Sequence, residues 1–122
     1  MNFRLFDGMS DGLERVLDLR REQHALTSAN LANANTPGYL AKEIPFDRLL
    51  GEVMDASARG AAPPPLDLRE LEPPPGSLDG NSVSAEREAV RLTENMTMYN
   101  ALASGTSRRL GLLRFAASDG RG

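Results

Sequence analysis

Few side chains in this sequence have the types and the spacing that chemistry requires. His24 is the only histidine, and it falls on an apolar stripe of a predicted helix, where a packed or hydrogen-bonded histidine is far more common than a catalytic or ligating one. No group of Asp, Glu and His residues has metal-ligand spacing, and neither a phosphate-binding nor a dinucleotide-binding fingerprint is present. Tyr39 and Tyr99 have no activating base close to them in the sequence. We therefore expect no catalytic residue, no metal site and no cofactor, and the chain is predicted not to be an enzyme.

The composition favours helices packed side by side. Hydrophobic residues make up 40% of the 122 residues, but aromatic residues only 5%, and there is no tryptophan. That length suits a single domain. The net charge of -3 gives no indication of nucleic-acid or membrane binding, and the lack of cysteine excludes disulfides and thiol chemistry. The N-terminus has no apolar run long enough for a signal peptide or a membrane span, so a cytoplasmic location is expected unless another export route exists.

The first region, residues 11–35, is predicted to be an amphipathic helix. Asp11 and Glu14 have the spacing of a capping box at its start. A second, narrower apolar line runs through Leu19 and Leu26. We expect the main stripe to form the buried face, as in other helices with this periodicity. The main stripe consists of Met9, Leu13, Val16, Leu17, His24 and Leu31, with Arg20 and Thr27 inside it.

The segment "NLANANTPGY" is predicted to end this helix and to reverse the chain. Asparagine amides compete for local backbone groups, and a residue that precedes proline avoids the helical region. Pro37 and Gly38 are the preferred central pair of a type II turn. We expect the helix to end at about Asn35, the amides to fix register, and Tyr39 to dock on a helix of its own subunit or of the next. The candidate assembly residues are Asn30, Asn33, Asn35, Thr36, Pro37, Gly38 and Tyr39.

The middle region, residues 39–82, is predicted to be extended at first and then briefly helical. Pro45 keeps the residue before it out of the helical region, so a short helix is expected from Phe46 or Asp47 to about Met54. Two triple prolines bracket part of the segment 60–76. Proline runs favour polyproline II and lack donors for a sheet, so this segment is predicted to be a semi-rigid spacer or a disordered loop. The apolar face of the short helix is Leu49, Leu50 and Val53.

The third region, residues 83–122, carries a heptad pattern that predicts a long helix in a left-handed coiled coil. Ser84 suits the N-cap, and Glu86 and Glu88 suit the first turn because carboxylates favour that end of the helix dipole. A helix from Ser84 to Ala117 would be about 50 Å long, so we expect it to pack against a helical partner. The predicted seam is Ala85, Ala89, Leu92, Met96, Tyr99, Ala103, Thr106, Leu110, Leu113 and Ala117, of which Leu92, Met96, Tyr99, Leu110 and Leu113 are the candidate contact residues.

The same helix has a second apolar line, formed by Met98, Leu102, Gly105 and Leu112. A two-helix hairpin covers one stripe of each helix, so the second line predicts packing against other copies of the chain or against related subunits. The alternative is a monomeric hairpin whose middle region folds back over that line.

Two parts of the sequence resemble a known family. "NLANANTPGY" closely resembles the N-terminal signature of the bacterial flagellar axial proteins, the family of rod, hook and hook–filament junction subunits. "TPGYLAKEIPFDRLL" and "SLDGNSVSAEREAVRLTENMTMYNALAS" are similar to the proximal rod subunits of the basal body. The resemblance covers about residues 9–55 and 77–117. The short middle region agrees with it, because larger rod and hook relatives carry sizeable β domains there. Leu40 departs from the polar or basic residue that relatives often carry.

The resemblance implies a mainly α fold, with long N- and C-terminal helices pairing as a coiled coil around a short extended middle region. It implies a structural subunit of the proximal rod that stacks helically, transmits torque and orders its terminal segments only on assembly. The implied partners are other copies, other proximal rod proteins, the rod-to-ring adaptor and the membrane (MS) ring protein. The implied location is the rod in the periplasmic space, reached through the flagellar type III export apparatus without a cleaved signal peptide. The alternative function is a soluble coiled-coil adaptor or export chaperone that binds a partner helix.

Overall fold

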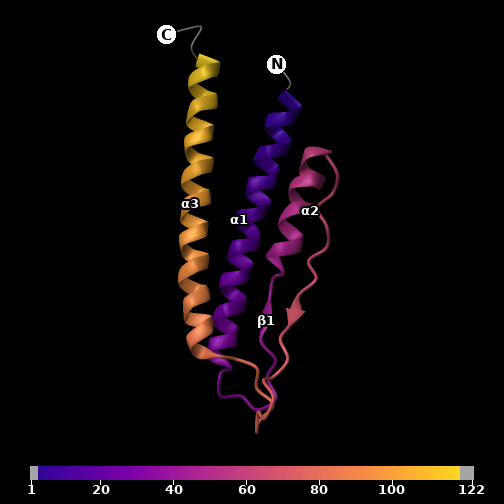
Figure 1. The fold of residues 1–122 in the computed structure, drawn as a ribbon. Coiled ribbons are helices and arrows are strands. Elements are labelled where there is room, and N and C mark those ends of the chain that lie inside the picture. Colours follow the sequence, from indigo (N-terminus) through magenta and orange to yellow (C-terminus); the bar gives the residue numbers. More distant parts are fainter. Residues whose placement is uncertain (1–2, 119–122) are drawn as a thin grey trace.

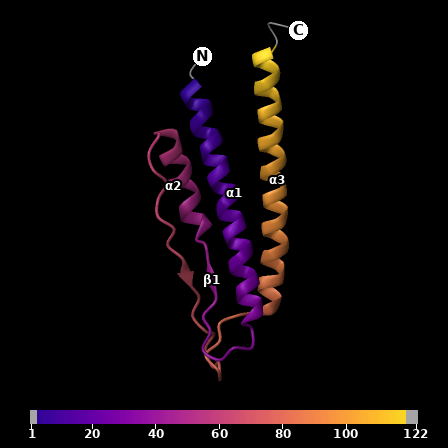
Figure 2. The same cartoon turned by 180° about the vertical axis from the view of Figure 1, so that it is seen from behind.

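Three helices lie along one long axis in the computed structural model, which describes residues 3–118 (Figure 1). The central helix α1 packs against α3 on one side and against α2 on the other (Figures 1 and 2). The start of α1 and the end of α3 lie at the same end of the molecule. The predicted mainly α fold, with two long terminal helices packed together, is confirmed. The elements are α1 (Phe3–Ala32), β1 (Lys42–Glu43), α2 (Phe46–Ala58), β2 (Arg69–Glu70) and α3 (Ala85–Ser118).

The bounds of α1 differ from the prediction at both ends. The helix already includes Phe3, so Asp11 and Glu14 lie inside it, and the predicted capping box is wrong. It ends at Ala32, three residues before Asn35. The N–H group of Asn33 reaches the carbonyls of both Ala29 and Asn30, at 3.1 Å each, so the last turn of the helix tightens there.

The buried face of α1 overlaps the predicted stripe only in part, since Val16 and Thr27 belong to both. Met9 and His24 are exposed, whereas Val16, Leu19, Gln23 and Asn30 are buried. The stripe is therefore wrong at Met9 and His24. The inward positions alternate spacings of four and three, which is the heptad pattern of paired helices. They are Gly12, Val16, Leu19, Gln23, Leu26 and Asn30.

The apolar core lies between α1 and α2. Leu66 and Leu68 of the proline-rich return segment and Leu102 of α3 pack against it. The helix α2 continues to Ala58, beyond the predicted end at Met54. Its exposed Leu50 contradicts the predicted apolar face, which instead uses Ala56. The buried core cluster is Val16, Leu19, Ile44, Leu49 and Val53.

The segment after α2 folds back along the outer side of α2, away from α3 (Figures 1 and 2). Its strand β2 pairs with β1 in antiparallel register, with Lys42 opposite Glu70 and Glu43 opposite Arg69. The middle region therefore packs on the face of α1 opposite α3. The monomeric-hairpin alternative requires this region to cover the second apolar line of α3, but Met98 and Leu112 of that line are exposed, and only Leu102 packs against the core. No helix within residues 3–118 is long and apolar enough to cross a membrane.

Candidate functional site

Asn30 lies where α1, β1 and α3 meet, and its amide is completely paired. Its Nδ2 donates to the Lys42 carbonyl at 2.9 Å and to Glu88 Oε2 at 3.1 Å. Its Oδ1 accepts from the Lys42 N–H at 3.0 Å and from the Tyr39 hydroxyl at 3.1 Å. The residue has 0% exposure. An asparagine amide has two donors and two acceptor lone pairs, so this one side chain fixes how the extended segment and α3 sit on the end of α1.

The turn after α1 has the predicted type II geometry. Gly38 has φ +73, and the N–H of Tyr39 donates to the Thr36 carbonyl at 3.3 Å. The third residue of such a turn needs a positive φ, which glycine adopts without steric cost. The turn therefore follows from the Pro37-Gly38 pair itself.

The segment before α3 braces this turn from the other side. Asn81 Nδ2 donates to the carbonyls of Asn33 and Thr36 at 2.9 and 2.7 Å. The N–H of Gly38 donates to the Asp79 carbonyl at 2.7 Å, and the N–H of Ser82 donates to the Tyr39 carbonyl at 3.0 Å. The two segments that carry the family resemblance are thus hydrogen-bonded to each other. We name this arrangement, from Asn30 to Tyr39 and from Asp79 to Ser82, the turn cluster.

The other predicted motif residues contribute less to the turn cluster. Asn33 Nδ2 donates to the Ala29 carbonyl, and Thr36 Oγ1 donates to Asn33 Oδ1 at 3.1 Å. Asn35 and Pro37 are exposed. The hydroxyl of Tyr39 bonds its own Asn30, so within the described chain its docking site belongs to the same subunit.

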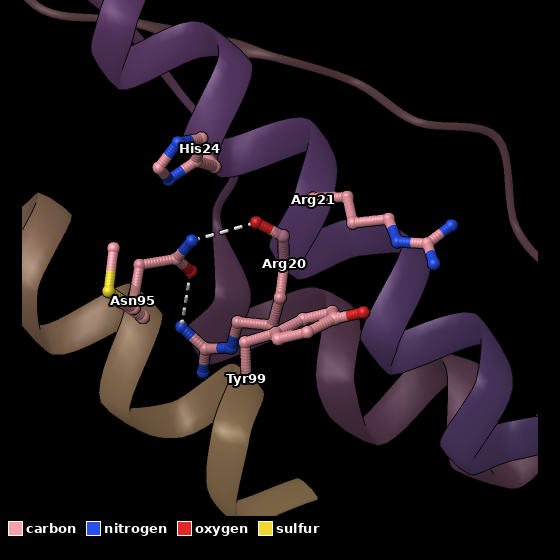
Figure 3. Close-up of a pocket in the computed structure, with 6 residues that line it drawn as sticks. Arg20, Arg21, His24, Asn95 and Tyr99 are labelled. Atoms are coloured by element: carbon pink, nitrogen blue, oxygen red, sulfur yellow. Dashed lines mark hydrogen bonds between the residues drawn. The ribbon is translucent and has the colours of Figure 1, made fainter. Parts of the chain in front are cut away.

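Charged and amide side chains continue the contact between α1 and α3. Asn95 Nδ2 donates to the Arg20 carbonyl at 2.7 Å, and Arg20 Nη1 donates back to Asn95 Oδ1 at 3.4 Å (Figure 3). Arg91 of α3 pairs with Glu43 Oε2 at 2.6 Å and with Glu88 Oε1 at 3.2 Å. Glu88 is almost fully buried, so its pairing with Arg91 and Asn30 offsets the cost of burying its charge.

The inward face of α3 keeps one of the two columns of the predicted seam and replaces the other by the residues one position earlier. Leu92, Tyr99 and Leu113 are half-buried, as a seam requires. Met96 is 51% exposed and Leu110 is 45% exposed, so the seam is wrong where it places these two against α1. The column that replaces them contains buried Glu88 and Asn95 and half-buried Leu102 and Arg109. The inward positions, again in heptad spacing, are Glu88, Leu92, Asn95, Tyr99, Leu102, Thr106, Arg109 and Leu113.

Several large apolar side chains of α3 remain exposed outside its inward face. Exposed apolar side chains that gather on one element often mark interaction sites. Met96 is one of them, but it lies at the edge of the contact with α1. We name the others the outer face of α3, which consists of Val90, Met98, Leu110, Leu112 and Phe115.

Three inward polar residues, Gln23, Glu88 and Asn95, are buried although the prediction gave them no inward role. Gln23 accepts from the Ile44 N–H at 2.8 Å and donates to the Thr27 hydroxyl at 3.1 Å. Gln23 and Asn30 are seven residues apart, and so are Glu88 and Asn95. A polar side chain repeated at heptad spacing inside a helix is typical of an inward position that carries hydrogen bonds.

A small open hollow lies between α1 and α3 beside the Asn95–Arg20 bonds (Figure 3). Its volume is about 300 Å³, and it is lined by Arg20, Arg21, His24, Asn95, Met96 and Tyr99. A hydrogen bond to Tyr99 raises the pKa of Arg21, and burial lowers the pKa of Arg20. Arginine stays protonated in proteins, so both remain cations at the rim of the hollow.

The described residues offer little for catalysis. Gly8-Met9-Ser10-Asp11-Gly12 has the spacing of a serine-hydrolase nucleophile elbow, which requires a sharp strand-to-helix turn. Here it lies inside α1, and His24 is a further 14 residues along the same helix, or about 21 Å away. Among the described residues no group of three or more His, Asp or Glu side chains could hold a metal ion.

Comparisons with known proteins agree with this geometry. The model of the flagella basal body rod protein family matches residues 17–39, which span the C-terminal half of α1 and the turn. The chain is 32% identical to the flagellar basal body rod protein FlgB of Escherichia coli over 115 residues, 80% of this chain and 83% of that protein. Identity to FlgB of Cereibacter sphaeroides is 34% over 112 residues, 84% of this chain and 88% of that protein. The chain therefore belongs to the FlgB family of flagellar basal body rod proteins.

Proposed function

We propose that the chain is a structural subunit of the flagellar rod that assembles through the outer face of α3. The observation that carries this proposal is the set of exposed Met, Leu and Phe side chains on a helix whose inward face is already occupied. Burying such side chains contributes about 1.5–3 kcal/mol each. A rod must resist torsion, and many simultaneous apolar contacts along a long helix suit that load.

The finer assignment rests on the family resemblance. The position in the rod is the proximal one, between the membrane ring and the distal rod. Its neighbours there are other copies of the chain, other proximal rod proteins, the rod-to-ring adaptor and the ring protein. The motif residues of the turn cluster hold the helices in the arrangement that assembles into the rod. The subunit leaves the cytoplasm through the flagellar type III export apparatus. The role is structural and uses no catalytic residue.

The test uses the absence of cysteine from the sequence. Met98→Cys and Leu112→Cys each introduce one thiol on the outer face of α3, which is then labelled with a maleimide that carries a photoreactive group. The variant is the only copy of the chain in a flagellated cell, and basal bodies are purified before and after illumination. We expect light-dependent adducts with rod components at both positions. Glu52→Cys, on the exposed side of α2, serves as the matched control.

Two results would count against the proposal. One is that the chain is absent from purified basal bodies. The other is that the labelled chain joins only a soluble cytoplasmic protein, which would favour the adaptor or export chaperone.

A further inference from the structure

Leu78 projects from a loop that is fixed in place. Its exposure is 105%, the highest among the exposed large apolar side chains of the described residues. The neighbouring Asp79 accepts hydrogen bonds on its carboxylate from the Ser77 hydroxyl and the Asn81 N–H, at 3.2 and 3.1 Å. The Asp79 carbonyl also accepts from the N–H of Gly38. The loop is therefore bonded to the turn cluster, so little conformational entropy remains to be lost if Leu78 is buried by a partner.

The hollow between α1 and α3 has the properties that such a side chain requires. Its lining is mostly apolar, and its volume of about 300 Å³ is at the small end of the range for binding pockets, which suits a single side chain. The cations Arg20 and Arg21 stand at its rim (Figure 3). The Arg20 guanidinium donates to Asn95 and lies 3.8 Å from the centroid of the Phe46 ring, whereas the Arg21 side chain is exposed. The hollow therefore favours an apolar side chain that is accompanied by a carboxylate.

Leu78 and the hollow cannot meet within one molecule. The loop is held at the end of the molecule opposite the termini (Figures 1 and 2). His24 is eight residues before the end of α1 at Ala32, so the hollow lies about 12 Å or more along the helix. The two surfaces can meet only between different copies.

We propose that Leu78 of one copy inserts into the hollow of a second copy, with Asp79 facing Arg20 and Arg21. This inference rests on the proposed function, because it requires copies of the chain to be neighbours. The contact joins two different patches of the same chain, so it is heterologous. Repeated heterologous contacts build an open helical assembly when their rotation does not close into a ring. The Leu78 loop and the hollow would thus set how far successive copies are displaced along the rod axis.

The experiment co-expresses two singly substituted chains with different tags in one flagellated cell. One chain carries Leu78→Cys, and the other carries Met96→Cys in the wall of the hollow. A short bismaleimide is added to purified basal bodies, and we expect a dimer that carries both tags. The control replaces Met96→Cys by Ser104→Cys, which is also exposed on α3 but lies outside both the hollow and the outer face, and a yield about tenfold lower is expected.

A second measurement uses Leu78→Ser. Because the side chain makes no intramolecular packing, we expect unchanged thermal unfolding of the isolated chain. In basal bodies built from a chain that carries both Leu78→Ser and Met96→Cys, a photoreactive maleimide on the Met96→Cys thiol should give about tenfold less adduct between copies than it gives with Met96→Cys alone, the loss expected from one buried leucine. An unchanged yield would overturn the proposal.

The proposal is also overturned if the Leu78 and Met96 thiols give no joint product while photoreactive labels at Met98 and Leu112 still reach rod components. In that case the proposed function stands without this contact. If the labels at Met98 and Leu112 also find no rod component, the proposed function fails, and this inference fails with it.

Discussion

At the scale of single residues, Asn30 shows why a poor helix former occupies the end of α1. Its amide makes four hydrogen bonds, two of them to the backbone of Lys42 and one to a residue 58 positions away in the sequence. A buried amide with all its bonds made specifies one arrangement of its neighbours, because an alternative arrangement would leave polar groups unpaired.

The first prediction concerns Asn30→Asp. The substitution keeps the size of the side chain but removes both donated hydrogen bonds and places a carboxylate beside Glu88. We expect the free energy of unfolding to fall by about 2–4 kcal/mol, measured by urea denaturation followed by circular dichroism. Asn35→Asp is the matched control from the same motif, since Asn35 is exposed and should change stability by less than about 0.5 kcal/mol. Equal effects at the two positions would contradict the role of Asn30.

The second prediction compares two glycines that have room for a methyl group. A Cβ atom at Gly38 or at Gly51 would have no heavy atom within 4 Å, but Gly38 has φ +73 and Gly51 lies inside α2. Gly38→Ala should lower the free energy of unfolding by about 1–2 kcal/mol, the cost of the left-handed region. Gly51→Ala should raise it by about 0.5–1 kcal/mol, the gain in helix propensity. Thermal unfolding followed by circular dichroism distinguishes the two directions of change. If both substitutions changed the free energy of unfolding in the same direction, backbone strain at Gly38 could not be the cause of its effect.

The sequence predicts the turn at this scale but not the partners of Asn30. The turn depends on neighbours in the chain, Pro37 and Gly38, whose backbone preferences are local. The bonds of Asn30 depend on where β1 and α3 come to lie, which is decided by packing over long sequence separations. The fully buried Glu88 is unpredictable for the same reason, because its charge is tolerated only with Arg91 and Asn30 in place.

At the scale of the elements, the heptad register of α3 differs between the prediction and the structure. The spacing of four and three predicts a long helix that pairs with another, and the structure has one. The predicted and the observed inward faces share the column that contains Leu92, Tyr99 and Leu113. They differ in the second column, which contains Met96 in the prediction and Asn95 in the structure. Hydrophobicity favours Met96. The structure uses Asn95, because the Arg20 carbonyl and guanidinium supply its hydrogen bonds.

The third prediction concerns the close packing of α1 and α2. A Cβ atom at Gly8 would lie 2.6 Å from the Ser57 carbonyl oxygen, so Gly8→Ala must push α2 away. We expect a loss of about 1–3 kcal/mol in the free energy of unfolding, the usual cost of overpacking, with faster proteolysis of α2. Gly105→Ala is the control, because a Cβ atom there meets no heavy atom within 4 Å and should stabilise α3. If Gly8→Ala were as well tolerated as Gly105→Ala, α1 and α2 would have to be farther apart than in this structure.

At the scale of the whole molecule, one side of the hairpin of α1 and α3 is covered by the rest of the chain and the other side is not. The middle region covers the α2 side of α1, and its proline-rich segment is anchored there by the pairing of β1 with β2. Nothing in residues 3–118 covers the outer face of α3. The sequence predicts that an apolar surface is left over, since two stripes on one helix exceed what a hairpin buries. It also predicts which one, the line through Met98 and Leu112, and both side chains are exposed. Leu102 of that line instead lies inward, because the inward column follows the polar bonds to α1.

The last prediction separates folding from assembly on this outer face. Met98→Glu and Leu112→Glu together place two charges on side chains that are already exposed. The isolated chain should therefore unfold within about 0.5 kcal/mol of the unchanged protein. In the rod the same carboxylates would be buried without partners, at a cost of several kcal/mol each, so a strain whose only copy is this variant should not swarm. The control is Glu52→Lys on α2, which also changes charge at an exposed site but lies off the outer face, and should swarm normally. Normal swarming by the double variant would place the assembly contacts elsewhere, since a helical subunit cannot bury two unpaired carboxylates in its interface and still form a rigid rod.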